Sequence, residues 1–214
     1  MCHLIETIAI ENGQFRNIEY HNQRFNKTRS DLFNEQNVLD ITQCTNVKSQ
    51  FDTFRRSACD LSHLWKCKVV YGKSEDGNPI YNVSFQPYQT RKIARLKAVI
   101  SNAINYMYKY EDRDKLNDLY ALKGDADDIL IIQNGLFTDG SIYNLVFQRK
   151  GNLFTPANPL LKGTKRQKLL DSGLIQEEKI RLNDLKYFEG VWLINAMNNL
   201  GDIPFIKSVQ ILCN

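Results

Sequence analysis

The sequence has no hydrophobic run long enough to cross a membrane, since none of its stretches approaches the ~20 apolar residues that a spanning helix requires. At its start, MCHLIETIAI reaches Glu6 before an apolar segment of the signal-peptide kind could form. These absences predict a protein with no membrane partner, and the cytoplasm is the expected compartment.

Cysteine is scarce and unpatterned. The five cysteines are odd in number, widely spaced and free of any C-x-x-C pair, which argues against a disulfide framework and against a zinc site. The three histidines do not cluster with them, so we expect no structural metal. These residues are Cys2, Cys44, Cys59, Cys67 and Cys213, with His3, His21 and His63.

A large excess of one charge is also missing. Lysine and arginine number 28 against 24 for aspartate and glutamate, a formal net charge of +4, and the basic residues form no long run. A solvated surface explains this pattern better than a nucleic-acid partner does. With 43% hydrophobic and 24% charged residues, the 214-residue chain has the composition of a globular protein of one large domain or two small lobes.

Alternating apolar residues and turn signals predict two hairpins and two helices in the first part of the chain. Asn12-Gly13 joins a strand in LIETIAIENG to a partner in FRNIEY, and EDGNP joins WKCKVVYGK to IYNVSFQPY. Helices are expected over about 21–33, where the spacing of Phe25 and Leu32 gives an apolar face, and over 49–59.

The second part of the chain is richer in strands. They are expected in IARLKAVISN, DDILIIQNG, IYNLVFQ, NLFTP and VWLINA, and helices in RDKLNDLYALKG, which Gly124 would end, and in KRQKLLDSG. The pattern breaks between residues 88 and 93, and we place a lobe boundary there. The expected fold class is α+β, with a small N-terminal lobe at 1–90 and a larger lobe at 91–214.

Lys109 stands among three tyrosines, Tyr106, Tyr108 and Tyr110, some residues after an expected apolar strand. This context permits a partly desolvated amine that is neutral and nucleophilic toward an aldehyde. It also fits, and taken alone favours, a surface lysine whose stem covers apolar neighbours.

TDGSIYNLVF places Asp139 after a strand and a turn and ahead of a second apolar strand. A carboxylate buried there needs a cationic partner or strong hydrogen bonds, and a protonated pyridine nitrogen would be such a cation. An ordinary turn aspartate is the alternative.

LLKGTKRQKLL places Gly163 ahead of a helix whose first turn contains Thr164 and Lys165. Backbone amides at a helix start suit a phosphate, and glycine permits its close approach. Arg24, on the first helix, could add a forked donor to the same phosphate, although a lone helical arginine is more often a surface residue.

Taken in order, these segments resemble the class IV pyridoxal-phosphate enzymes, which include branched-chain and D-amino-acid aminotransferases and aminodeoxychorismate lyase. The resemblance covers most of the chain. LIETIAIENG is similar to the family's ETI-type strand, and His21 with Arg24 is similar to its H-x-x-R helix. Asp139 and Asn144 resemble its acidic residue followed five positions later by asparagine, FTPANPLLKGTKR resembles its phosphate-binding segment, and VWLINAM resembles its last cofactor-contacting strand.

The resemblance implies pyridoxal 5′-phosphate as cofactor, a homodimer, and the two lobes of D-amino-acid aminotransferase: a small N-terminal α/β lobe and a larger C-terminal β-barrel-like lobe. Lys109 would hold the cofactor as a Schiff base and move the substrate's Cα proton, and Asp139 would keep the pyridine nitrogen protonated. The other cofactor contacts that it implies are Arg24, Asn144, Gly163, Thr164, Lys165, Asn195 and Ala196.

The sequence departs from the family pattern in two places. It begins almost on the ETI motif, without the strand and G-D-G turn that many members have before it, so we expect a trimmed small lobe. Transaminases tend to have a tyrosine five residues after the lysine, where this chain has Asp114. Arg113, next to it, looks more like the lyase pattern.

Lyase and transaminase share the same core site, so the choice rests on few residues. Asn195-Ala196 resembles the N-A pair of lyases, and Thr7 aligns with a threonine implicated in lyase catalysis, although transaminases share it. We favour aminodeoxychorismate lyase, which releases pyruvate and leaves 4-aminobenzoate for folate biosynthesis, over an amino-acid aminotransferase. A non-catalytic binding module is the remote alternative. Candidates for holding the substrate carboxylate are Arg113, Lys68, Lys73 and Arg91.

Overall fold

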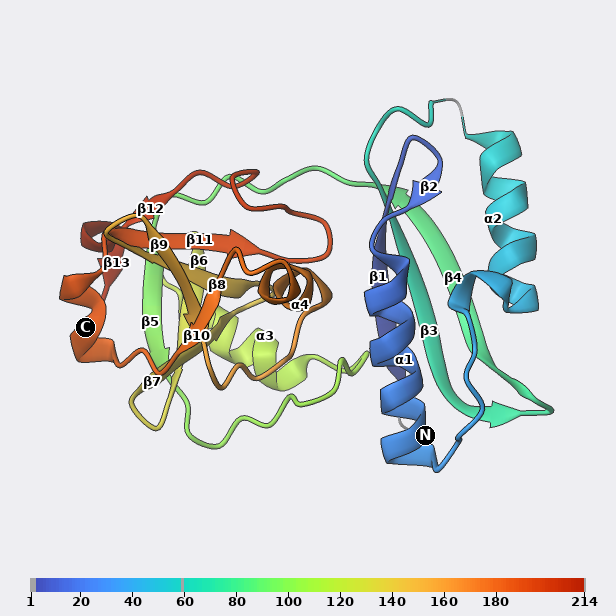
Figure 1. The fold of residues 1–214 in the computed structure, drawn as a ribbon, viewed down its shortest axis with the longest axis horizontal. Coiled ribbons are helices and arrows are strands. Elements are labelled where there is room, and N and C mark those ends of the chain that lie inside the picture. The colour runs from blue at the N-terminus through green and yellow to red at the C-terminus, as the bar shows by residue number, and fades with distance from the viewer. Residues whose placement is uncertain (1–2, 59, 214) are drawn as a thin grey trace. The chain divides into compact units, whose positions relative to one another are not determined.

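The structure is a computed structural model that describes residues 3–58 and 60–213 (Figure 1). The chain forms two compact units. Unit 1 comprises Met1–Gln89 together with Tyr108–Asp112, and unit 2 comprises Thr90–Met107 together with Arg113–Asn214. The chain therefore leaves unit 1, begins unit 2, and returns to unit 1 for a short segment before it completes unit 2. This return places Lys109 in unit 1.

An antiparallel sheet with the strand order β2-β1-β3-β4 forms the centre of unit 1. Its strands are β1 (Leu4–Glu11), β2 (Gln14–Phe15), β3 (Trp65–Glu75) and β4 (Asn78–Pro87). Asn12 and Gly13, with φ angles of 50° and 70°, make the turn between β1 and β2. Asparagine and glycine tolerate this left-handed backbone better than other residues, and it matches the twist of a hairpin.

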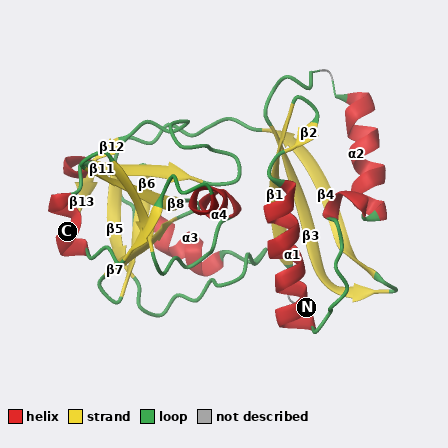
Figure 2. Cartoon of the chain, viewed as in Figure 1, coloured by secondary structure: helices red, strands yellow, loops and turns green. Residues whose placement is uncertain are grey.

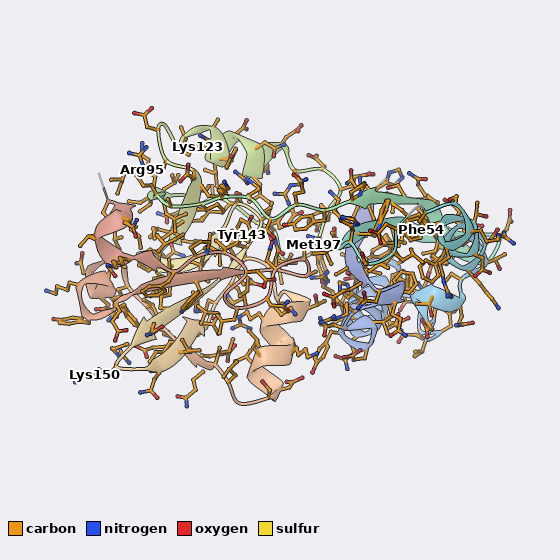
Figure 3. The ribbon with its side chains drawn as sticks, turned by 90° about the horizontal axis from the view of Figure 1, so that it is seen from above. Phe54, Arg95, Lys123, Tyr143, Lys150 and Met197 are labelled. Atoms are coloured by element: carbon orange, nitrogen blue, oxygen red, sulfur yellow. The ribbon has the colours of Figure 1, made fainter. Side chains whose placement is uncertain are left out.

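Helices α1 (Ile18–Phe33) and α2 (Thr45–Ser57) pack on this sheet, α1 against β1 and β3 and α2 against β4 (Figure 2). The 3-10 helix η1 (Ile41–Gln43) precedes α2. Phe54 of α2, labelled in Figure 3, stacks on Phe85 of β4 with 4.5 Å between the ring centroids. Stacked aromatic rings of this kind supply much of the apolar contact that holds a helix on a sheet.

The returning segment Tyr108–Asp112 pairs with the start of β1. The Ile5 N–H donates to the Lys109 carbonyl at 2.9 Å, and the Glu111 N–H donates to the His3 carbonyl at 2.9 Å. These backbone bonds fix Lys109 against β1.

One mixed sheet forms most of unit 2, with the strand order β10-β9-β8-β7-β6-β5-β13 and with β11 paired to both β8 and β12. β5 runs parallel to β6 and β13, and β9 runs parallel to β10, whereas the other pairs are antiparallel. The strands are β5 (Leu96–Ile100), β6 (Asp128–Gln133), β7 (Leu136–Gly140), β8 (Asn144–Arg149), β9 (Asn152–Pro156), β10 (Gln176–Glu178), β11 (Gly190–Ile194), β12 (Ile206–Lys207) and β13 (Ile211–Leu212).

The rest of unit 2 covers this sheet. It includes helices α3 (Asp114–Ala121) and α4 (Thr164–Asp171) and the 3-10 helices η2 (Leu182–Tyr187) and η3 (Ser208–Gln210). Strands β6 and β8 are almost wholly buried, as expected of strands covered on both faces. Tyr143, labelled in Figure 3, belongs to the core, whereas Lys150 in the β8–β9 turn lies on the surface.

The expected mixed α/β fold is confirmed, and the two expected hairpins of unit 1 are present. The extent of the first hairpin was wrong, because residues 18–20, expected in its second strand, begin α1 instead. Asn17 adopts a left-handed φ of 52°, which ends the extended chain and starts the helix.

Two further expectations need correction. The apolar face of α1 does not include Leu32, which is 37% exposed; its buried face contains Phe25 with His21, Thr28 and Arg29. Strand β7 was not predicted, and Asp139, expected between a turn and the next strand, lies within it. The short run Leu136–Gly140 mixes apolar and turn-forming residues, so its local pattern conceals the pairing with β6 that makes it a strand. Cys2 and Cys59 lie outside the described residues.

Candidate active site

Asp139 is a buried carboxyl group near the end of β7 in unit 2, only 6% exposed. It accepts a hydrogen bond from the Asn144 side-chain amide at 2.7 Å and another from the Leu160 backbone N–H. Burial raises the pKa of Asp139 to about 7, although the Leu160 amide and the charge of Arg166 act in the opposite direction. An acid in such surroundings favours a cationic ligand, because a nearby positive charge would stabilise its ionised form.

Asn144 connects Asp139 to the start of α4. Its side-chain amide also donates to the Leu161 carbonyl at 2.9 Å, in the loop that leads into the helix. A Cβ atom on Gly163 would lie 2.0 Å from the Asn144 side-chain oxygen, so any other residue there would clash. Glycine therefore lets β8 and the helix start approach each other, and the Asp139 carboxyl and the first turn of α4 belong to one site.

The first turn of α4 is buried at Thr164, Lys165 and Arg166. The Lys165 ammonium donates to the Asn199 side chain, and the Arg166 guanidinium donates to Glu177 at 2.6 Å. The first amides of a helix have no acceptor within the helix and lie at the positive end of its dipole. This helix start can therefore receive an anion, and Lys165 adds positive charge in the same turn.

The loop after β11 reaches the same part of unit 2. The Asn195 side-chain oxygen accepts hydrogen bonds from the N–H groups of Met197 and Asn198, both at 2.9 Å. Its amide donates to the Ile142 carbonyl at 3.3 Å, and Ala196 is half-buried beside it. These contacts place Asn195 and Ala196 next to the turn that joins β7 and β8.

A buried polar cluster in unit 1 surrounds Glu6 of β1. The Arg24 side chain donates to both carboxylate oxygens of Glu6, at 2.8 and 2.6 Å, and His21 Nδ1 lies 2.6 Å from one of them. Burial opposes the ionisation of Glu6, but the charge and hydrogen bonds of Arg24, with help from His21, hold its pKa at about 2. Burial lowers the pKa of His21, so the imidazole is neutral and donates Nδ1–H to Glu6.

Lys109 lies near this cluster. After burial, the positive charges of Arg24 and Lys109 both lower the pKa of His21 further, while Glu6 opposes them. Lys109 is therefore within electrostatic range of the buried His21 imidazole in unit 1.

The candidate substrate residues are divided between the two units. Lys68 and Lys73 lie in unit 1, as does Thr7, whereas Arg113 lies in unit 2. Thr7 of β1 stands opposite Lys68 of β3, and the Lys68 ammonium lies 2.8 Å from Glu111. Lys73 is exposed near the end of β3. In unit 2, the Arg113 guanidinium donates to the Ser141 carbonyl at 2.8 Å.

The structure thus divides the predicted site residues between the two units. Unit 1 contains Thr7, Arg24, Lys68, Lys73 and Lys109, and unit 2 contains Arg113, Asp139, Asn144, Gly163, Thr164, Lys165, Asn195 and Ala196. The sequence prediction assigned no role to Glu6, Asp128 or Ser141. A glutamate in an otherwise apolar strand was the available signal for Glu6, whereas the partners of Asp128 and Ser141 are distant in sequence.

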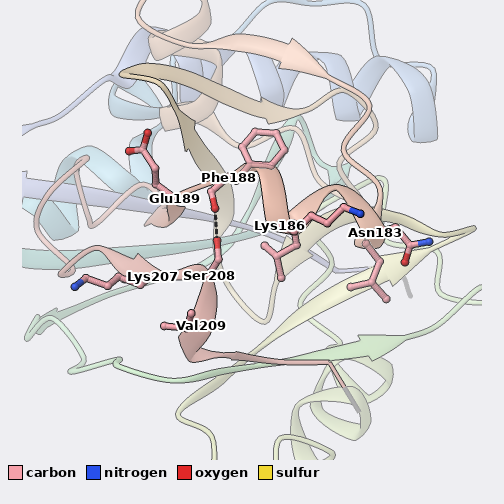
Figure 4. A pocket seen from close by; sticks show the side chains of 9 residues that line it. Asn183, Lys186, Phe188, Glu189, Lys207, Ser208 and Val209 are labelled. Carbon is pink, nitrogen blue, oxygen red and sulfur yellow. Dashed lines mark hydrogen bonds between the residues drawn. The ribbon is translucent and has the colours of Figure 1, made fainter.

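A separate hollow of about 580 Å³ in unit 2 lies between η2 and η3 (Figure 4). Leu182, Phe188 and Val209 are among its apolar lining residues, and Lys186 and Lys207 add positive charge. None of the predicted site residues lines it, so the hollow does not enter the proposed chemistry.

Residues 3–58 and 60–213 contain neither a metal-ligand cluster nor a membrane-spanning helix. No group of three histidine, cysteine, aspartate or glutamate side chains there is arranged as metal ligands would be. No helix in this described part is long and apolar enough to cross a membrane.

Comparisons with known proteins give a consistent answer. The family model for amino-transferase class IV matches residues 3–204. An uncharacterized protein of Haemophilus influenzae is 34% identical over 200 residues, which are 94% of this chain and 100% of that protein. A solved structure of a candidate 4-amino-4-deoxychorismate lyase from Haemophilus somnus is 34% identical, with a TM-score of 0.81 over 94% of this chain and 98% of that one.

A more distant structure shares the fold. A hypothetical aminotransferase from Mycobacterium tuberculosis, in its PLP-bound form, superimposes with a TM-score of 0.75 at 17% identity, over 95% of this chain and 80% of that one. The family is pyridoxal-phosphate-dependent and acts on small molecules. Because the family model spans most of the chain, this protein is an enzyme that belongs to the amino-transferase class IV family.

Proposed function

We propose that this enzyme uses pyridoxal phosphate, bound covalently to Lys109, to remove pyruvate from 4-amino-4-deoxychorismate. The observation that carries the cofactor assignment is the burial of Asp139. Its hydrogen-bond donors are neutral amides, and its pKa is raised to about 7. A protonated pyridine nitrogen fits this carboxyl, because it supplies the cation that the dry surroundings favour.

The other contacts fit the rest of the cofactor. The start of α4 suits its phosphate, since Gly163 keeps the approach open and Lys165 adds positive charge. Arg24, oriented by Glu6, is the proposed phosphate donor from unit 1. When bound, pyridoxal phosphate supplies an electron sink for the substrate's Cα.

Side chains of this protein then carry out the proton transfers. Lys109 takes the proton from the substrate's Cα, for which the amine must be neutral. The bond between the ring carbon and the ether oxygen of the enolpyruvyl group then breaks. The leaving group takes up a proton to become pyruvate, and the ring becomes aromatic as 4-aminobenzoate, so atoms and charge balance. Thr7, half-buried on β1, is the second proposed catalytic side chain.

The Haemophilus somnus relative supports the lyase assignment, because it is similar to this chain over nearly its whole length. Asn195-Ala196 and Asp114 support it from the sequence. The cytoplasm is the proposed compartment, and folate biosynthesis is the proposed pathway.

An amino-acid aminotransferase is the second candidate, and the contacts of Arg113 favour it. Arg113 was a reason to expect a substrate with several carboxylates, but its guanidinium donates to the Ser141 carbonyl and the Tyr106 hydroxyl and lies over the Tyr106 ring. An arginine held in this way is less available to a substrate.

The assay that separates the candidates compares both reactions on the same preparation. We expect pyruvate and 4-aminobenzoate to form from aminodeoxychorismate faster than any amino group passes from L- or D-amino acids to 2-oxoglutarate. A coupled lactate dehydrogenase assay measures the pyruvate, and chromatography measures the 4-aminobenzoate and the amino acids. Rapid transfer of the amino group of L-glutamate, with no pyruvate formed from aminodeoxychorismate, would establish the aminotransferase instead.

We also expect a homodimer. Large apolar side chains of unit 2 are exposed, among them Ile100 at 67%, Met107 at 66% and Val209 at 86%, and exposed apolar surface is commonly covered by association. Light scattering with size-exclusion chromatography should give twice the mass of the chain at assay concentrations. A monomer with full activity would contradict this expectation.

A further inference from the structure

The turn between β7 and β8 sets the spacing of two proposed site residues. Asp139 lies near the end of β7, and Asn144 is the first residue of β8. The two residues are directly opposite each other where these strands pair. Only Gly140, Ser141, Ile142 and Tyr143 separate them. The hydrogen bond between Asn144 and the Asp139 carboxyl therefore depends on the geometry of this turn.

Ser141, 6% exposed, has a partner for each of its polar groups. Its hydroxyl donates to the Asp128 carboxylate at 2.9 Å, and its backbone N–H donates to the other oxygen of Asp128 at 3.2 Å. Its carbonyl accepts a hydrogen bond from Arg113 at 2.8 Å. A residue bound at all three groups has little freedom to move.

Asp128 is fully buried at the start of β6, and its charge is compensated. Arg91 donates to it at 3.2 Å, and the Ile129 N–H donates at 2.7 Å. Arg91 is itself held by the Tyr120 hydroxyl at 2.7 Å. A buried carboxylate with this many donors is a rigid anchor, because each lost partner would leave a desolvated charge.

The other carbonyls of the turn are held as well. The Ile142 carbonyl accepts from the Asn195 amide at 3.3 Å, and the Tyr143 carbonyl accepts from the Gly140 N–H at 2.8 Å. The turn is thus fixed along its length, with the strongest, charge-assisted contacts at Ser141.

We propose that Asp128, Ser141 and Arg113 form a turn brace that holds Asp139 in register with Asn144, which makes Asp128 a positioning residue for the reaction. The effect of the brace on the reaction rests on the proposed function. The contacts of the brace and its effect on Asp139 are independent of the proposed function, because they lie entirely within the protein.

The brace predicts a change at Asp139 when Asp128 is altered. Asp128→Asn keeps the size of the side chain, but its amide would face the donors of Arg91 and Ser141, so the turn should shift and admit water to Asp139. Burial is the largest cause of the raised pKa of Asp139, ahead of the opposing Leu160 amide and Arg166 charge. Exposure should therefore lower that pKa.

The test uses the full chain without and with pyridoxal phosphate. Carboxyl ¹³C NMR of aspartate-labelled, cofactor-free protein should show the Asp139 pKa at least about one unit lower in Asp128→Asn than in the wild type. The dissociation constant of pyridoxal phosphate, from fluorescence quenching, should rise roughly tenfold. Ser141→Ala should give the same changes in weaker form, and Ser141→Thr, which keeps the hydroxyl, should restore the wild-type values.

Asp127→Asn is the matched control. Asp127 neighbours Asp128 and also binds backbone groups, but these are the N–H groups of Ala94 and Arg95, at 2.8 and 2.9 Å, which lie outside the turn. Its loss should lower stability without moving the Asp139 pKa.

Three results decide the proposal. Wild-type values of the Asp139 pKa and of cofactor affinity in Asp128→Asn or Ser141→Ala would overturn the brace, as would equal shifts in Asp127→Asn. If Asp128→Asn does not fold, Ser141→Ala and Ser141→Thr provide the same comparison. A shifted Asp139 pKa in a protein that does not bind pyridoxal phosphate would support the brace and refute the proposed function.

Discussion

Lys109→Ala is expected to abolish the covalent attachment of pyridoxal phosphate and to lower turnover by on the order of ten-thousandfold. The variant loses both proposed tasks of the amine, which are to bond the cofactor's aldehyde carbon and to move the substrate's Cα proton. Visible absorbance after addition of pyridoxal phosphate measures the attachment. Borohydride reduction followed by peptide mass spectrometry identifies the lysine, and labelling of a different lysine in the wild-type enzyme would refute the assignment.

The fold should survive this substitution. The contact of Lys109 with β1 is made by its backbone carbonyl, which accepts from the Ile5 N–H, and alanine keeps that group. Lys48→Ala, at an exposed position of α2 in the same unit, is the matched control and should keep the bound cofactor. A second readout needs no cofactor: the charge of Lys109 lowers the pKa of His21, so the His21 pKa should rise in Lys109→Ala.

Local sequence patterns predicted most of the secondary structure, because turn-forming residues mark where one strand ends and the next begins. Asn12-Gly13 and the EDGNP segment tolerate left-handed backbone and separate runs of alternating apolar residues, so both hairpins of unit 1 could be found. Strand β7 was not predicted, because its extended conformation depends on pairing with β6 and β8 and not on its own composition.

The position of Lys109 could not be predicted in the same way. Its neighbours in sequence lie beyond the first strand of unit 2, yet segment 108–112 pairs with β1, far away in sequence. Such a return depends on the tertiary pairing of β1, which no local periodicity reports.

Side-chain partners were the least predictable part of the site. Asp139 and Asn144 could be paired in advance from the family resemblance, and the structure brings them within hydrogen-bond distance. Arg113 was predicted to bind the substrate, but its guanidinium donates a hydrogen bond to the Ser141 carbonyl, 28 positions away in the sequence. Glu6 had no predicted role, although His21 and Arg24, one turn apart on α1, converge on it.

Asp139→Asn should lower turnover by about a thousandfold or more while pyridoxal phosphate still binds. The substitution keeps the shape of the side chain but removes the negative charge that would stabilise a protonated pyridine nitrogen, which costs several kcal/mol of stabilisation for charge developing at the substrate's Cα. Steady-state kinetics and a cofactor-binding titration measure the two effects. Asp127→Asn is the control, and near-normal turnover in Asp139→Asn would rule out the proposed role.

The same substitution has a pH signature in the cofactor-free enzyme. The pKa of Asp139 is about 7 when folded, against 3.8 for an ordinary aspartate, so between these values the folded state binds more protons than the unfolded state. The free energy of unfolding should therefore fall as pH rises from about 4 to about 7 and level off above, by roughly 1.4 kcal/mol for each unit of pKa difference. Asparagine does not titrate, so Asp139→Asn should flatten this part of the curve.

Chemical denaturation of both proteins at about pH 4.5 and about pH 7.5 measures the difference. Saturating pyridoxal phosphate should also reduce the slope in the wild type, because the positive pyridine nitrogen lowers the Asp139 pKa and brings it nearer to the unfolded value. The cofactor should have no such effect in Asp139→Asn. If wild type and variant lose the same stability between these pH values, Asp139 ionises as an exposed acid does, and the proposed pairing with the cofactor loses its physical basis.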